Sequence, residues 1–257
     1  MTHLYYMNSQ LFKGIVFLLC FCCNISFSQH VHFDDCQSVY KKRYVGERTH
    51  ILYIGGGDYH DDLRKAAELR KFLEIENDYF VTYTEDYNVF ENRLEDYDLI
   101  LLNTKLNRLT DPQYSGLLKA VKNGMPLLAI HGASASFRNT SPVERPEYYK
   151  MIGAKFDYHP KIHKFKLHLF KDNGLLDATF ANFSVIDELY YYSQFENDNK
   201  VLLYATYLDE SSPMAWVRNY GKGRVFYTAL GHSPAVSADP NFQNLVLFAV
   251  KWCLNNN

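Results

Sequence analysis

Short apolar segments alternate with helix-forming segments through the first half of this 257-residue chain. The apolar segments cover residues 50–54, 80–84, 99–102 and 126–130. Helix-forming segments follow the first three of them, at residues 61–76, near residue 91 and at residues 111–123. Strands and helices that alternate at this spacing form right-handed βαβ crossovers. The pattern therefore predicts an α/β fold with a doubly wound parallel sheet.

The segment from residue 111 to residue 124 carries start and stop signals for a helix. Asp111 is placed to cap the helix, Pro112 suits its first position, and Gly124 follows its end. The next segment, residues 126–130, is apolar on both faces, as a central strand of a parallel sheet must be.

The segment 61–76 predicts a second helix with one apolar face. We expect this face to consist of Leu63, Ala66, Ala67, Leu69, Phe72 and Leu73. Asp61 and Asp62 lie in the first turn, where the helix dipole favours negative charge.

After residue 153 the pattern changes to strands. Residues 164–170 alternate between polar and apolar side chains, which is typical of an antiparallel strand with one face in solvent. Further strands are expected at residues 201–206, 214–218 and 224–228, with a closing helix after Pro240. We therefore expect an antiparallel β layer added to the parallel sheet, within one domain that covers residues 48–257.

The N-terminus has the composition of a signal peptide. Lys13 precedes an apolar run at residues 14–23, and small residues lead to Ser28. The run is shorter than the roughly 20 residues that span a bilayer, so no stable membrane anchor is expected. Residues 1–28 are predicted to be a signal peptide and residues 29–47 a leader segment, which predicts a periplasmic or secreted protein.

The charge balance argues against a nucleic-acid partner. The chain has 27 Lys and Arg residues against 29 Asp and Glu residues. Binding to a phosphate backbone requires a basic excess, which this composition lacks.

The strand at residues 126–130 runs directly into His131-Gly132-Ala133. A sharp turn at the end of a parallel strand presents one side chain at the edge of the sheet where ligands bind. The imidazole of His131 could serve there as a base, an acid, a polarising group or a metal ligand. The alternative is a histidine that only forms hydrogen bonds with nearby loops.

Several segments together resemble the trehalose-utilisation (ThuA-like) family, over roughly residues 51–252. The resemblance is carried by Tyr59-His60-Asp61, Ile130-His131-Gly132-Ala133, His159-Pro160, Asp187-Glu188-Leu189-Tyr190 and the segment from Tyr220 to His232. This family belongs to the class I glutamine amidotransferase-like fold. The resemblance thus implies a flavodoxin-like parallel sheet with the added β layer.

The resemblance also places His131 where true glutamine amidotransferases carry their nucleophilic cysteine. Their base histidine falls on His232, and the carboxylate expected two residues later falls on Pro234. Without a thiolate no covalent glutamyl intermediate can form, so glutaminase activity is not expected.

The same comparison implies the site residues. The catalytic candidates are His131, His232 and Glu188. The ligand-binding candidates are Gly56, Gly57, His60, Asp61, Asn103, His159, Asp187 and Tyr190. For Asp187 and Glu188, a solvated strand edge is the alternative.

Two kinds of chemistry remain open. Neutral imidazoles from His60, His131 and His232, together with a carboxylate, suit zinc or a similar divalent ion. Alternatively, Glu188 or Asp187 works with His131 or His232 in metal-free acid–base catalysis.

By resemblance, we expect an exported carbohydrate-active enzyme, a hydrolase or isomerase acting on trehalose-like or keto saccharides. The alternative is a non-catalytic carbohydrate-binding or accessory module. Convergence of His131, His232 and Glu188 in the folded chain would favour the enzyme.

Overall fold

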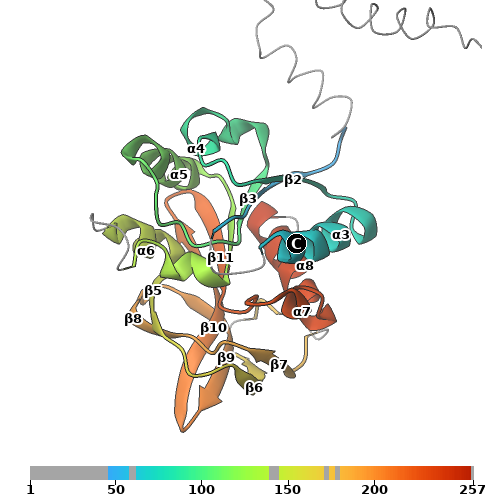
Figure 1. Cartoon of the computed structure of the whole chain (residues 1–257), viewed down its shortest axis with the longest axis vertical. Coiled ribbons are helices and arrows are strands. Elements are labelled where there is room, and N and C mark those ends of the chain that lie inside the picture. The colour runs from blue at the N-terminus through green and yellow to red at the C-terminus, as the bar shows by residue number, and fades with distance from the viewer. Residues whose placement is uncertain (1–45, 58–61, 139–144, 171–173, 177–179, 256–257) are drawn as a thin grey trace, which may run out of the picture. The chain divides into compact units, whose positions relative to one another are not determined.

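The computed structural model describes residues 46–57, 62–138, 145–170, 174–176 and 180–255 (Figure 1). The predicted signal peptide and almost all of the leader segment lie outside the described residues, and so do His60 and Asp61. Within the described part of the chain, no helix is both long and apolar enough to cross a membrane.

Among the described residues, five parallel strands form one side of a nine-stranded sheet. They are β1 (His50–Ile54), β2 (Phe80–Thr84), β3 (Leu99–Leu102), β4 (Leu127–Ile130) and β11 (Gly223–Thr228). Their order, β2-β1-β3-β4-β11, is that of a flavodoxin-like fold. Every residue of β1, β3 and β4 is buried, as strands covered on both faces require. The predicted parallel α/β core is therefore confirmed.

Helices cover both faces of this parallel region (Figure 1). The helical segments are α3 (Asp62–Lys71), the π-helical η2 (Phe72–Glu76), α4 (Val89–Asn92), the 3₁₀ turn η3 (Leu94–Asp96), α5 (Asp111–Asn123), α6 (Pro146–Ile152), α7 (Pro234–Ser237) and α8 (Pro240–Leu254). One group, α4, α5 and α6, lies on one side of the parallel strands, and α3, α7 and α8 lie on the other. This is the doubly wound arrangement that the sequence predicts.

The start of α5 differs by one residue from the prediction. Thr110, rather than Asp111, caps the helix, because its hydroxyl accepts a hydrogen bond from the backbone of Gln113 at 3.3 Å. The Gln113 side chain in turn accepts one from the backbone of Thr110 at 3.0 Å. This reciprocal capping box satisfies two N–H groups that a helix start otherwise leaves unpaired.

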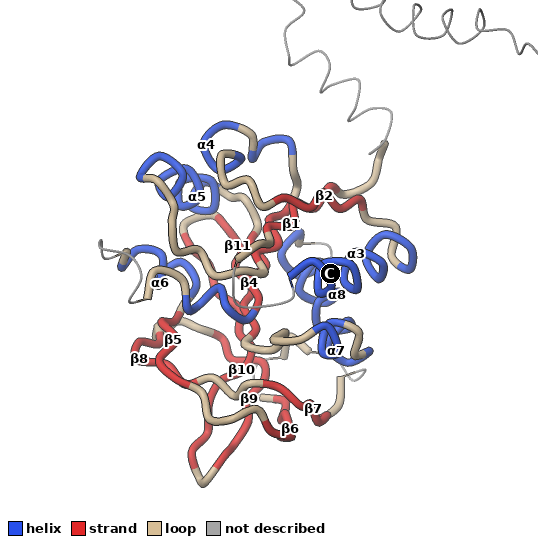
Figure 2. The backbone as a smooth tube through the Cα atoms, in the orientation of Figure 1, coloured by secondary structure: helices blue, strands red, loops and turns tan. Residues whose placement is uncertain are grey.

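Four antiparallel strands continue the same sheet beyond β11. In spatial order they are β10 (Glu210–Tyr220), β9 (Lys200–Tyr207), β6 (His163–Leu169) and β7 (Phe183–Asp187). A separate antiparallel pair is formed by β5 (Ala154–Tyr158) and β8 (Tyr191–Phe195) (Figure 2). The strands predicted at residues 164–170, 201–206 and 214–218 are thus confirmed as β6, β9 and β10, whereas the one predicted at residues 224–228 is the parallel strand β11. The sequence does not predict β5, β7 or β8.

The predicted buried face of the helix at residues 61–76 is confirmed in part. Ala66, Leu69, Phe72 and Leu73 are buried, whereas Leu63, at 65%, and Ala67 are exposed. Asp62 and Lys65, which the sequence does not place on this face, are also buried: the Lys65 ammonium lies 2.8 Å from an Asp62 carboxylate oxygen and donates to the Asn103 side chain at 3.4 Å. The helix therefore buries an ion pair beside the end of β3.

This buried ion pair yields a stability prediction. Lys65→Met should lower the free energy of unfolding by about 3 kcal/mol, because it leaves the Asp62 carboxylate buried without its counter-charge. The double variant Asp62→Leu/Lys65→Met should recover most of that loss, since no uncompensated charge remains. Urea denaturation of both variants measures the difference, and equal stability of the single and double variants would contradict it.

Candidate functional site

His131 is the first residue of the 3₁₀ turn η4 (His131–Ala135), which directly follows β4. Its φ is 49°, in the left-handed region that non-glycine residues rarely adopt. Such strain costs about 1–3 kcal/mol and persists where the surrounding structure enforces it. The predicted turn at the end of this strand is confirmed, and the imidazole it presents is fully buried.

The His131 ring is oriented by a backbone carbonyl. Its Nδ1 lies 2.7 Å from the carbonyl oxygen of Ala229, which follows β11. Because a carbonyl can only accept, Nδ1 carries the hydrogen and donates it. Nε2 then faces the Tyr190 hydroxyl at 3.0 Å and a Glu188 carboxylate oxygen at 3.4 Å.

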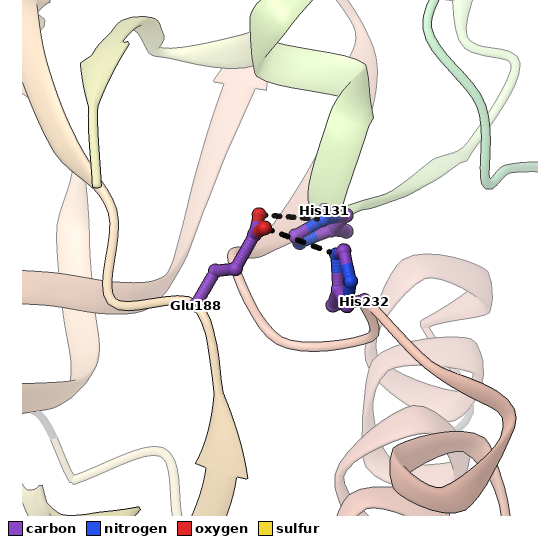
Figure 3. Close-up of side chains that lie close together, drawn as sticks. All are labelled: His131, Glu188 and His232. Carbon is purple, nitrogen blue, oxygen red and sulfur yellow. Dashed lines mark ion pairs between the residues drawn. The ribbon is translucent and has the colours of Figure 1, made fainter. Parts of the chain in front are cut away.

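Glu188 directly follows β7, and its carboxylate is the centre of the site. Its oxygens lie 3.4 Å from His131 Nε2, 3.3 Å from His232 Nδ1 and 3.4 Å from His159 Nε2. Figure 3 shows the Glu188 carboxylate beside the rings of His131 and His232, which come from separate segments. Burial opposes ionisation of Glu188, but the interactions with His131 and His232 outweigh it and hold its pKa well below the ordinary value.

His232 is positioned through the backbone of its own loop. The neighbouring Glu188 carboxylate raises the pKa of His232, although partial burial opposes this shift. Gly231, which precedes it, has φ 115° and leaves no room for a side chain, since a Cβ there would lie 2.7 Å from the Ile130 side chain. Asp187 accepts hydrogen bonds from the backbone of Gly231 at 2.9 Å and of His232 at 3.3 Å.

Asp187 is buried, so the alternative of a solvated strand edge is wrong for this residue. Its carboxylate also accepts from the backbone of Glu188 at 2.8 Å. Burial raises the pKa of Asp187, and the charge of His131 and the backbone donors oppose that rise. Asp187 thus ties the loop that carries His232 to the segment that carries Glu188.

Of the other predicted residues, Tyr190 and His159 border this cluster, whereas the Asn103 side chain binds other partners. Tyr190 stacks at a tilt on His131, with ring centroids 4.7 Å apart, and His159 contacts Glu188 from the end of β5. Asn103 instead donates to the Tyr53 hydroxyl at 2.6 Å and accepts from Lys65.

Gly56 and Gly57 form the loop after β1, where the Thr104 hydroxyl donates to the Gly56 carbonyl. This loop and Asn103 lie at the same edge of the sheet, because β1 and β3 are parallel neighbours that both end there. The placement of His60 and Asp61 stays a prediction, because both lie outside the described residues.

Two site neighbours escape the sequence analysis. Burial raises the pKa of Asp62, and the nearby His131 is among the groups that oppose this rise. Glu188 raises the pKa of His232, and the charge of Lys65 is among the causes that oppose it. The i,i+3 spacing of this acidic and basic pair at the start of a helix is a sequence signal, although such pairs usually face solvent.

Three donor atoms of the cluster could bind one ligand atom together. One atom each from His131, Glu188 and His232 lies within 4.8 Å of the other two. Such a group can exchange protons with a substrate or bind a cation. In the described part of the chain the one cysteine, Cys253, is buried in α8, so no described thiol accompanies His131 and His232.

Residues 50–253 match a family described as ThuA, trehalose utilisation. The chain belongs to the ThuA family. It has no match among the curated proteins.

Solved structures with the same fold include two ThuA-like proteins. The one from Parabacteroides merdae is 18% identical, with a TM-score of 0.70, over 82% of this chain and 91% of that chain. The one from Bacteroides uniformis is 19% identical, with a TM-score of 0.66, over 80% of this chain and 90% of that chain. A β-galactosidase from Bacillus circulans is 11% identical, with a TM-score of 0.56, over 80% of this chain but 31% of that enzyme.

The role of Asp187 can be tested by stability and local opening. Asp187→Asn should lower the free energy of unfolding by about 2 kcal/mol, because a neutral amide oxygen replaces a charged acceptor for buried backbone N–H groups. Hydrogen exchange at Gly231 and His232 should accelerate in parallel. Asp209→Asn, at an exposed turn residue between β9 and β10, is the matched control and should change neither quantity strongly. Unchanged exchange in Asp187→Asn would show that this carboxylate does not hold the loop.

Proposed function

We propose that this ThuA-family chain is an enzyme that cleaves or isomerises a saccharide at the cluster of His131, Glu188 and His232. The observation that carries the proposal is the convergence of three histidines on one carboxylate. The four residues come from the ends of β4, β5, β7 and β11, so only the folded chain brings them together. His131 and His232 follow neighbouring parallel strands at the sheet edge where ligands bind in folds of this kind.

Catalysis explains the composition of the cluster better than binding alone. A saccharide-binding module needs hydrogen-bonding groups and stacking surfaces, and it has no need for several titratable side chains against one another. Burying such groups is costly, and they gather where a reaction uses them. Here His131 is fully buried and the Glu188 side chain is 9% exposed.

The access route and the neighbours suit a small polar substrate. The side chains of His232 and His159 are 26% and 35% exposed, so the cluster is reached from their side. His159 offers a ring nitrogen to a hydroxyl group, and Tyr190 offers a hydroxyl beside His131. The family's description as trehalose utilisation and the fold shared with part of a β-galactosidase support a saccharide as that substrate.

Each residue then has a distinct task. His131 presents Nε2 in a fixed orientation, because Ala229 binds its other nitrogen. Glu188 supplies negative charge at the centre, and Asp187 positions the loop of His232. We propose a trehalose-like disaccharide or its keto form as the class of substrate.

Substitution of His131 tests the proposal most sharply. His131→Asn suits the left-handed backbone, because asparagine tolerates positive φ better than other residues do. This variant should lose at least about 100-fold in kcat/KM toward disaccharides or their keto forms, the usual worth of a positioned acid–base or polarising group.

His168→Gln is the control, since His168 lies on β6 and stacks on Tyr204, with ring centroids 5.3 Å apart, outside the cluster. It should keep wild-type kcat/KM. Full turnover by His131→Asn would overturn the assignment. Saccharides that raise the melting temperature of the wild type without any product would instead support a binding module.

We also propose that the chain is exported, on the strength of Lys13 and the apolar run at residues 14–23. Expression of the full chain in a Gram-negative host should give a mature protein that begins at Gln29 and is found outside the cytoplasm. Intact mass and N-terminal sequencing of the fractions measure this. An unprocessed protein confined to the cytoplasm would contradict export.

A further inference from the structure

We infer that His131 Nε2, Glu188 and His232 together bind one divalent transition-metal ion of the zinc type. This inference rests on the proposed function, because the ion would occupy the same site and serve as its cofactor. The sequence suggests His60, His131 and His232 with a carboxylate; His60 lies outside the described residues, and Glu188 supplies the carboxylate.

The separations within the cluster are unusual among the ion pairs of this protein. The described pairs Lys65–Asp62, Arg70–Glu74, Arg145–Asp111, Lys150–Glu147 and Arg218–Asp198 have N···O distances of 2.6–2.8 Å. Charge-assisted hydrogen bonds have this length. The contacts of Glu188 with His131, His232 and His159 are 3.4, 3.3 and 3.4 Å, and Arg138–Asp157, a more exposed pair, is also long at 3.6 Å.

The longer separations fit ligands around a metal ion. Zinc binds histidine nitrogen and carboxylate oxygen at about 2.0–2.2 Å in a tetrahedral arrangement. Two ligand atoms of such a tetrahedron are about 3.3 Å apart. The two distances belong to different Glu188 oxygens, Oε2 toward His131 and Oε1 toward His232. One donor atom of each residue lies within 4.8 Å of the other two, so a single ion can contact all three when the side chains draw together around it.

The orientation of His131 points the same way. Its Nδ1 donates to the Ala229 carbonyl, which turns Nε2 toward the Glu188 carboxylate at 3.4 Å and the Tyr190 hydroxyl at 3.0 Å. A backbone carbonyl that binds the distal nitrogen of a histidine is also the usual outer-shell partner of a metal ligand.

Three protein ligands leave one position of a four-coordinate ion open. Catalytic zinc sites have this composition, whereas structural sites are closed by four protein ligands. The partial exposure of His232 gives a substrate oxygen or a water molecule a path to that position. Two nitrogen donors also favour zinc-type ions over Mg²⁺, which prefers oxygen ligands.

Metal binding can be measured without any activity assay. The purified mature protein, stripped with a chelator and titrated with ZnCl₂ by calorimetry, should bind one equivalent. Glu188→Gln and His232→Asn should each weaken the affinity by at least about 100-fold, because even the loss of an outer-shell partner costs 10–100-fold. His168→Gln should bind as the wild type does, and MgCl₂ should not compete.

Replacement of the ion with Co²⁺ adds a spectroscopic readout. Visible ligand-field bands of low-symmetry Co²⁺ should appear in the wild type and vanish in Glu188→Gln, with far-ultraviolet circular dichroism confirming that the variant is folded. A stripped wild type that binds no Zn²⁺, or variants that bind it with wild-type affinity, would overturn the inference.

The outcomes separate this inference from the proposed function. Saccharide turnover that survives complete removal of metal would leave the proposed function standing and refute the ion's part in it. One tightly bound equivalent without turnover of any saccharide would support the metal site and count against the enzyme.

Discussion

The Glu188 carboxylate, placed within 3.4 Å of nitrogen atoms from three histidines, is the interaction on which the site depends. An isolated carboxylate at this depth would lose its hydration without compensation. The ring nitrogens of three imidazoles surround it and supply that compensation. The fold around Glu188 can be understood as a means of bringing these imidazoles to one point.

Backbone groups perform most of that positioning. The Ala229 carbonyl orients His131, and the Asp187 carboxylate binds the N–H groups of the loop that carries His232. Both anchors lie at strand ends: Ala229 directly follows β11, and Asp187 is the last residue of β7. Sites supported in this way keep their geometry without relying on long flexible side chains.

The sequence predicts the framework well because its signals are local. Continuous apolar runs give the buried parallel strands, and the alternating pattern of β6 gives an antiparallel strand. The turn at His131 was predictable for the same reason, since the apolar run of β4 stops there and Gly132, which tolerates turn conformations, follows directly.

The parts that the sequence missed depend on distant contacts. The helix α3 buries Lys65 and Asp62 instead of Leu63, because Asn103, far along the chain, offers the lysine a partner. Likewise, nothing near His131 in sequence reveals that Ala229 fixes its tautomer. The family resemblance suggested His131, Glu188 and His232 as a group, but their separations could come only from the folded chain.

Anomalous diffraction at the zinc absorption edge tests the central claim most directly, with crystals of the mature protein grown in the presence of Zn²⁺. We expect one strong peak about 2.0–2.2 Å from His131 Nε2, a Glu188 oxygen and a His232 ring nitrogen. Electron density with the His131 ring turned away from Glu188, and no peak between them, would contradict the claim.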